Sequence, residues 1–188
     1  MESNEKTIVL LGDSLFAYHD GWDELDPTAK ILNLGRGGDN TAGVLRRVKD
    51  ACGHKPEIIF LEVGVNDLAQ GQSRENVVEN HLIIWQTVAL MSPQTRLIVC
   101  SLLPINDKLI PVKNSSLFSF FIPDINKKLS KLTKLFRVEY IDVFESMADS
   151  FNLLPNHMTD DGIHLLKPGY EVFLDCLKLR VNQKILAE

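Results

Sequence analysis

The sequence has few of the features that would assign it to several large classes of protein. None of its apolar runs approaches the length of about 18 residues that a membrane-spanning helix needs, and we expect no transmembrane segment. It has no excess of basic residues, because 20 Lys and Arg against 25 Asp and Glu leave a net charge of −5. Since binding to phosphate backbones requires a basic surface, we expect no nucleic acid partner.

Cysteine is also scarce. Cys52, Cys100 and Cys176 lie far apart in apolar surroundings, which predicts buried, reduced thiols. No pair spacing supports a catalytic cysteine or a metal site. The polar start, residues 1–6, shows no signal-peptide pattern, and we expect a cytoplasmic protein.

The composition that remains is that of a globular protein. Apolar residues make up 45% of the chain and charged residues 24%, so a buried core can form. The length is suited to one domain, 1–188.

Short apolar runs alternate with helical patterns along the chain. The runs predict strands at 7–11, 30–34, 57–63, 96–102 and 138–143. Between and after them, apolar residues recur every three or four positions, with Ser73 as the N-cap of the second pattern and Pro168 near the start of the last. These helical stripes are Val44, Leu45, Val48 and Cys52; Val77, His81, Trp85, Val88 and Met91; Ile125, Leu129, Leu132 and Phe136; and Tyr170, Phe173, Leu177, Val181 and Ile185. The alternation predicts an α/β protein with three layers, α/β/α, around a five-stranded parallel sheet.

Ligands of such sheets bind beyond the carboxyl ends of the strands, and polar residues follow three of the predicted strands. Ser14 comes directly after the first, in Gly12-Asp13-Ser14-Leu15, where it is either a reactive hydroxyl or an ordinary N-cap. A glycine-rich loop, 35–40, follows the second. It could bind an oxyanion or a phosphate, or it could be an ordinary turn. Asn66 follows the third and could donate to an oxyanion or form a turn.

Near the C-terminus, Asp161 lies three residues before His164, with Asp160 beside it. A carboxylate at this spacing can accept a hydrogen bond from the imidazole and orient it as a general base. A metal site made of the same residues is the alternative, but no strand end offers an obvious further ligand.

Taken together and in this order, the blocks resemble the SGNH hydrolases, also known as GDSL lipases and esterases. The resemblance covers roughly residues 7 to 175, and the run from Gly37 to Thr41 is closest to the branch of platelet-activating-factor acetylhydrolase-like and microbial acylesterase members. It implies a flavodoxin-like SGNH hydrolase fold. It also implies Ser14 as nucleophile, His164 as base and Asp161 as orienting acid.

By the same resemblance, the N–H groups of Ser14 and Gly38 and the side chain of Asn66 form an oxyanion hole. The implied activity is serine-dependent hydrolysis of a small carboxylic ester, of lipid, acyl or thioester type, without cofactor or metal. Removal of an O-acetyl group from a carbohydrate, and a non-catalytic ligand-binding module of the same fold, are the alternatives.

One further segment, 103–124, follows the fourth predicted strand and reads as a connection of about twenty residues before the next helix. Such long connections usually serve a function. We expect it to line the acyl side of the site, to pack on the sheet, or to form the contact of a possible homodimer. Its apolar residues are Leu109, Ile110, Val112, Leu117, Phe118, Phe120, Phe121 and Ile122.

Overall fold

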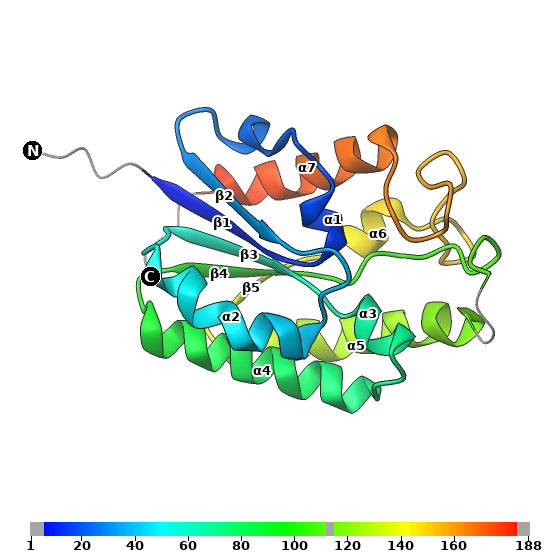
Figure 1. The fold of residues 1–188 in the computed structure, drawn as a ribbon, viewed down its shortest axis with the longest axis horizontal. Helices are drawn as coiled ribbons and strands as arrows, with labels where there is room; N and C mark the ends of the chain where they lie inside the picture. The colour runs from blue at the N-terminus through cyan, green and yellow to red at the C-terminus, as the bar shows by residue number, and fades with distance from the viewer. Residues whose placement is uncertain (1–5, 112–114, 184–188) are drawn as a thin grey trace, which may run out of the picture.

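A five-stranded parallel sheet forms the centre of the molecule (Figure 1). The computed structural model describes residues 6–111 and 115–183, without the side chains of 115–117. The strand order is β2-β1-β3-β4-β5, and the predicted parallel sheet is confirmed. The strands are β1 (Thr7–Gly12), β2 (Lys30–Gly35), β3 (Ile58–Glu62), β4 (Arg96–Cys100) and β5 (Glu139–Ile141).

This strand order creates a switch point between β1 and β3. The chain moves outward from β1 to β2 and then returns to the other side of β1, so that the connections after β1 and β3 diverge. Such a divergence leaves a crevice at the carboxyl edge of the sheet. Gly12 pairs with both Gly35 and Glu62, so the three strands end side by side.

Helices cover both faces of the sheet, as the alternation predicts (Figure 1). One face packs against α2 (Thr41–Gly53), α4 (Arg74–Met91) and α5 (Ser115–Thr133). The other packs mainly against α1 (Ser14–Ala17), the 3₁₀ turn η1 (Trp22–Leu25), α6 (Val143–Met147) and α7 (Lys167–Val181). The short α3 (Val65–Ala69) follows β3.

The predicted helical stripes are largely buried. Ser73 caps α4 by accepting a hydrogen bond from the Asn76 N–H, as predicted. Met91 is an exception, because it ends α4 with 55% of its surface exposed. Ile185 of the last stripe lies outside the described residues.

The prediction of a long connection over 103–124 is wrong in its second half, because α5 begins at Ser115. Phe118, Phe121 and Ile122 continue the helical spacing of Ile125 backwards and pack against the core. Pro123 interrupts one backbone hydrogen bond, but the packing outweighs that loss. Of the other apolar residues named there, Val112 and the side chain of Leu117 lie outside the described residues.

Two sequence expectations concern what the fold contains. All three cysteines are free and buried, as predicted. Within the residues that the structure describes, none of the helices is long and apolar enough to cross a membrane.

Candidate active site

Ser14 lies at the start of α1, directly beyond the end of β1. Asp13 caps this helix, and its carboxylate accepts a hydrogen bond of 3.0 Å from the Leu15 N–H. The turn presents the Ser14 hydroxyl at the carboxyl edge of the sheet, where the sequence analysis expects it.

His164 reaches Ser14 from the far end of the chain. Its Nε2 lies 3.0 Å from Ser14 Oγ, and its Nδ1 lies 2.5 Å from Asp161 Oδ2. Asp161 Oδ1 also accepts from the backbone N–H groups of Ile163 and His164, at 2.8 Å each. Partial burial raises the pKa of Asp161, but these hydrogen bonds outweigh it and hold the pKa below its ordinary value. Asp161 is therefore charged at neutral pH and orients the ring of His164.

The turn that carries Asp161 and His164 depends on Gly162. Its φ is +89°, and a Cβ there would lie 2.3 Å from the Asn106 carbonyl oxygen. Asn106 N–H donates to the Gly162 carbonyl at 2.7 Å, and Thr159 Oγ1 accepts from the Gly162 N–H at 2.9 Å. The segment after β4 thus holds the histidine loop in place.

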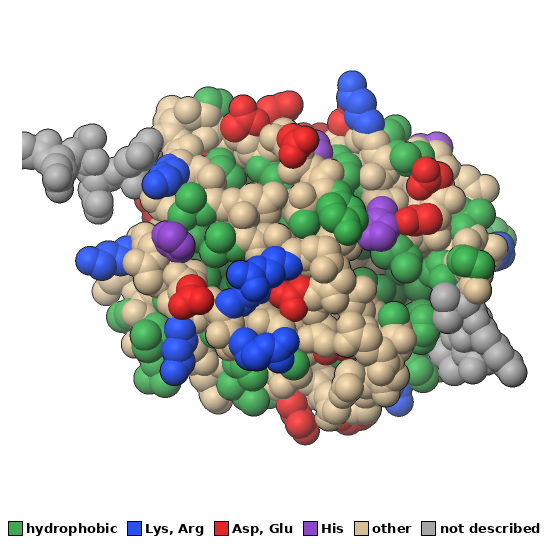
Figure 2. Space-filling view, in the orientation of Figure 1, with side chains coloured by type: hydrophobic (Ala, Val, Ile, Leu, Met, Phe, Trp, Pro, Cys, Tyr) green, Lys and Arg blue, Asp and Glu red, His purple; other side chains and the backbone are tan. Residues whose placement is uncertain are grey.

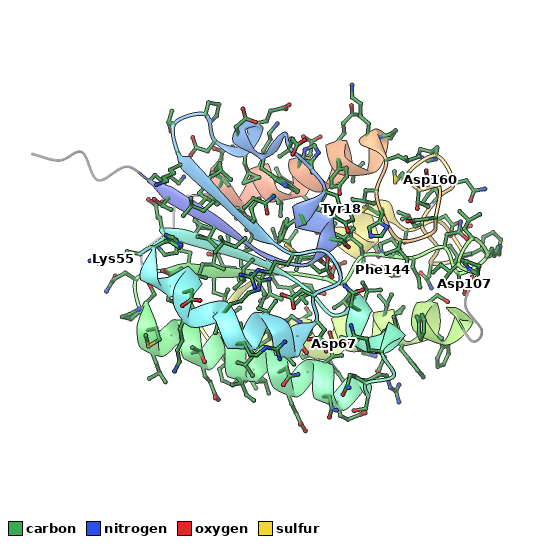
Figure 3. The ribbon with its side chains drawn as sticks, in the orientation of Figure 1. Tyr18, Lys55, Asp67, Asp107, Phe144 and Asp160 are labelled. Atoms are coloured by element: carbon green, nitrogen blue, oxygen red, sulfur yellow. The ribbon has the colours of Figure 1, made fainter. Side chains whose placement is uncertain are left out.

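The His–Asp pair lies at the surface. The side chains of His164 and Asp161 are 38% and 49% exposed, and Figure 2 shows a histidine and an acidic side chain together among hydrophobic side chains. The ring of Tyr18, labelled in Figure 3, lies 5.2 Å from the His164 ring between centroids. The imidazole is therefore open to solvent, whereas Ser14 itself is 3% exposed.

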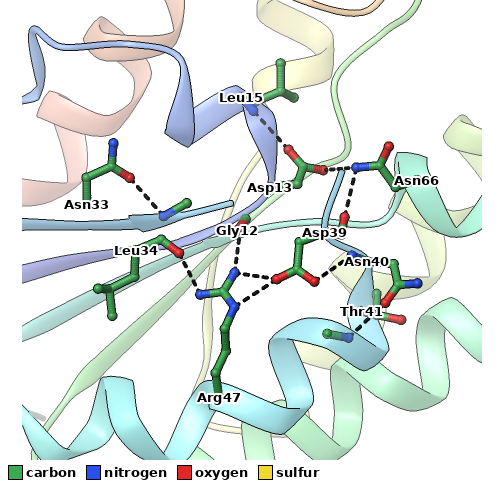
Figure 4. Close-up of polar contacts among 12 residues, drawn as sticks. Gly12, Asp13, Leu15, Asn33, Leu34, Asp39, Asn40, Thr41, Arg47 and Asn66 are labelled. Atoms are coloured by element: carbon green, nitrogen blue, oxygen red, sulfur yellow. Dashed lines mark hydrogen bonds and ion pairs between the residues drawn. The ribbon is translucent and has the colours of Figure 1, made fainter. Parts of the chain in front are cut away.

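The glycine-rich loop after β2 and the turn after β3 meet beside Ser14. Gly38 has φ of +72°, and no atom lies within 4 Å of the position of an added Cβ. Asn66 Nδ2 donates to the Asp39 carbonyl at 2.8 Å and lies 3.4 Å from Asp13 Oδ2 (Figure 4). The first contact anchors the amide, and the long second contact leaves an N–H that a developing oxyanion can take.

Arg47 connects these loops, and the sequence analysis missed it. Arg47 is 7% exposed, and its guanidinium donates to the carbonyls of Gly12 and Leu34 at 2.7 and 2.6 Å (Figure 4). It also pairs with the Asp39 carboxylate at 2.7 Å. The signal in the sequence is its position between Val44 and Val48 on the buried stripe of α2, where a charged residue needs a partner.

Asp67 is a second residue that the sequence analysis did not single out. It is 1% exposed and accepts hydrogen bonds from the Thr41 N–H at 2.9 Å and the Thr41 hydroxyl at 2.5 Å. Burial raises its pKa, although the two hydrogen bonds from Thr41 act in the opposite direction. The pair links the start of α2 to α3, and it fixes the glycine loop relative to Asn66.

The structure thus brings together Ser14, Asn66, Asp161 and His164, with Gly38 next to Asp39, whose carbonyl Asn66 binds, while Asp160 is outside the hydrogen-bond chain. Among the described residues, no three His, Cys, Asp or Glu side chains are grouped to hold a metal ion. A hydroxyl bonded to an oriented imidazole, with amide donors beside it, is able to perform acyl transfer.

Comparison with known proteins agrees with this chemistry. A model of the GDSL-like Lipase/Acylhydrolase family matches residues 10–172. The human platelet-activating factor acetylhydrolase IB subunit alpha2 is 30% identical over 175 residues, which cover 90% of this chain and 73% of that protein. The bovine subunit alpha1 is 28% identical over 179 residues and covers 90% and 72%.

Solved structures show the same fold. The lipase/acylhydrolase from Enterococcus faecalis superposes with a TM-score of 0.75 at 19% identity, over 94% of this chain and 95% of that one. A GDSL-like lipase from Bacteroides thetaiotaomicron gives 0.78 at 19% identity, over 94% and 87%. The family match spans most of the chain, so the protein belongs to the GDSL-like lipase and acylhydrolase family and is a carboxylic ester hydrolase.

Proposed function

We propose that Ser14 is the nucleophile of this hydrolase, with His164 as general base and Asp161 as its orienting acid. The observation that carries the proposal is the hydrogen-bond chain from Ser14 Oγ through His164 to Asp161, at 3.0 and 2.5 Å, between residues 150 positions apart. His164 takes the hydroxyl proton as Ser14 attacks the ester carbonyl. The imidazolium is then stabilised by the charged Asp161.

The negative charge that develops on the carbonyl oxygen needs donors on the opposite side of the site. The N–H groups of Ser14 and Gly38 and the Asn66 amide supply them. His164 then protonates the leaving alcohol, and the C–O bond of the ester breaks to leave an acyl-serine. Water, activated by the same histidine, releases the acid.

For the substrate, we propose an ester of a short acyl group, acetate or a few carbons longer. The names of the human and bovine relatives describe acetylhydrolases, which supports a short acyl chain. We place the acyl side next to α5, which contacts the helix of Asn66, and next to Ile110, whose side chain would meet a Cβ at Gly162. Phe118 and Phe121 pack against the core, whereas Phe120 is 73% exposed and free to meet a substrate or a second copy of the chain.

Labelling with a fluorophosphonate tests the nucleophile. We expect a single modification at Ser14, and we expect Ser14→Ala to abolish labelling and p-nitrophenyl ester hydrolysis, a loss on the order of 10⁶ in turnover, with unchanged circular dichroism. Buried Ser101, whose hydroxyl accepts from the Phe144 N–H, is outside this site, so label there would argue against the assignment. Turnover by Ser14→Ala above a tenth of the wild-type rate would refute it.

A chain-length panel tests the substrate proposal. Esters from acetate to palmitate, with an acetylated sugar and an acyl thioester, are compared in wild type and in Phe120→Ala. We expect kcat/KM to peak at short chains and the variant to shift the peak. If the peak stays while a homodimer dissociates, as measured by light scattering, Phe120 belongs to an interface instead.

The cytoplasm is the compartment that we propose for this activity. Support comes from the three free, buried cysteines, which are typical of a reducing compartment. Fractionation of cells that express the tagged protein tests this, and recovery of the tag outside the cytoplasm would contradict it.

A further inference from the structure

Glu62 is a buried acid directly behind the proposed nucleophile. It ends β3 opposite Gly12 of β1 and is 1% exposed. Ile58 and Phe60, which share its face of the strand, are fully buried in the apolar layer. An ionised carboxylate in such a place requires a compensating charge or several donors.

No such compensation is found in the part of the chain that the structure describes. Neither oxygen of Glu62 accepts a hydrogen bond from an N–H or O–H group there. The carboxyl group of Asp13, fully buried, directly follows Gly12, the residue that pairs with Glu62, and the two acids interact. Two ionised carboxylates cannot hydrogen-bond, because neither has a proton to donate. The contact becomes a hydrogen bond when one of the two is protonated.

The surroundings decide which acid holds the proton. Asp13 accepts from the Leu15 N–H at 3.0 Å and lies 3.4 Å from Asn66 Nδ2 (Figure 4), and both contacts favour its charged form. Glu62 has neither. Burial raises the pKa of Asp13 to about 7, and burial together with the nearby charge of Asp13 raises the pKa of Glu62 well above its ordinary value. The proton therefore resides on Glu62.

The other titratable groups around the pair do not change this assignment. Cys100 of β4 and Tyr170 of α7 face Glu62, and burial raises the pKa of each, so both are neutral and bring no positive charge. Asp13 is influenced by Asp39, which raises its pKa, and by His164, which lowers it.

We propose that Glu62 is a positioning residue that stays protonated at neutral pH and donates a hydrogen bond to the Asp13 carboxylate. When Asp13 is ionised, the pair carries one negative charge. The donated bond fixes Asp13, which caps the helix turn of Ser14 and faces the Asn66 amide. It also draws charge density away from the carboxylate beside the oxyanion, while the remaining charge favours the imidazolium of His164. The proposal rests on the function proposed above for Ser14 and Asn66.

Two substitutions of similar size distinguish a Glu62 that donates a hydrogen bond from one that only fills space. Glu62→Met removes the donor, and we expect kcat to fall at least tenfold while KM changes less than threefold. Glu62→Gln restores an N–H donor, and we expect it to recover most of that loss. Glu57→Gln is the matched control, because Glu57 precedes the same strand and its side chain is 55% exposed. Thermal melting confirms that each variant is folded.

Infrared spectroscopy tests the protonation without turnover. We expect the carbonyl band of a protonated carboxylic acid at pH 7 in wild type and in Ser14→Ala, and its loss in Glu62→Gln but not in Glu57→Gln. A wild-type spectrum without this band overturns the proposal. So does a folded Glu62→Gln variant with kcat reduced more than tenfold, or a Glu62→Met variant with unchanged kcat. If Ser14→Ala remains active but the band is present, the proposed role of Ser14 is wrong, whereas the protonation of Glu62 is supported.

Discussion

Asp160 and Asp161 are adjacent in the chain, yet they differ in what surrounds them. Both are exposed, but Asp161 accepts hydrogen bonds from the His164 ring and from two backbone N–H groups, and Asp160 makes none of these bonds. At the residue scale, a catalytic role therefore depends on a few hydrogen bonds and not on the type of side chain.

We expect Asp161→Asn to lower kcat strongly, by roughly 10²-fold to 10⁴-fold. An amide can donate to Nδ1 of His164 and stabilise the tautomer that cannot accept the Ser14 proton. Asp160→Asn is the matched control and is expected to keep kcat within about twofold. Ester hydrolysis under saturating substrate measures both, and the opposite ranking would assign the role to Asp160.

Asn66 offers a second test at this scale. We expect Asn66→Ala to lower kcat by roughly 10²-fold to 10³-fold with little change in KM, because the N–H that makes only the long contact with Asp13 binds the oxyanion in the transition state more strongly than the substrate carbonyl. Asn76→Ala, on the exposed side of α4, is the control. A raised KM with unchanged kcat would make Asn66 a substrate-binding residue.

At the scale of elements, α4 supports the site through an uncharged histidine. His81 is fully buried, and its Nε2 donates to the carbonyl of Val63, directly before the turn of Asn66. Burial lowers its pKa from 6.5 to about 4, although the bond to Val63 acts in the other direction. The sequence analysis places His81 correctly on the buried stripe of α4, as a core residue.

This shift predicts a specific loss of stability in acid. Below pH 6.5 the unfolded chain binds a proton at His81 while the folded protein does not, so the free energy of unfolding falls as the pH drops to about 4. The shift corresponds to about 3 kcal/mol. We expect His81→Gln, which keeps a donor for Val63 but does not titrate, to flatten this part of the curve.

Urea titrations at several pH values between 4 and 7 measure the effect. His54→Gln, at an exposed histidine after α2, is the control and should follow the wild-type curve. Equal slopes for wild type and His81→Gln would show that His81 is protonated in the folded state.

At the scale of the whole molecule, the site is complete only when three strand ends and the loop before α7 meet. The connections after β1, β2 and β3 supply Ser14, Gly38 and Asn66, and the loop before α7 supplies His164. In the proposed reaction, His164 carries out each proton transfer, and side chains or backbone N–H groups stabilise each charge that develops.

We therefore expect no dependence on added metal. Dialysis of the whole protein against EDTA should leave kcat and KM for a short ester unchanged, within error of a mock-dialysed sample. Activity that is lost on chelation and restored by a divalent ion would return the Asp161–His164 pair to a metal site.

Local patterns in the sequence determined the layers of the fold and the residues of the candidate site. The spacing of apolar residues in strands and helices involves residues close together in the chain, and so does the spacing of Asp161 and His164. Both can therefore be recognised in the sequence without a structure. The meeting of Ser14 with His164 could be predicted from the rule that parallel strands end at one edge of a sheet, and from the family resemblance.

Tertiary structure alone decided the strand order, the start of α5 and the buried polar contacts behind the site. Arg47 meets Gly12 across 35 positions, and Glu62 meets Asp13 through the pairing of β1 with β3. Such contacts depend on which strands become neighbours and on how deeply each group is buried. The sequence around each residue contains neither quantity, because both arise only when distant segments pack together.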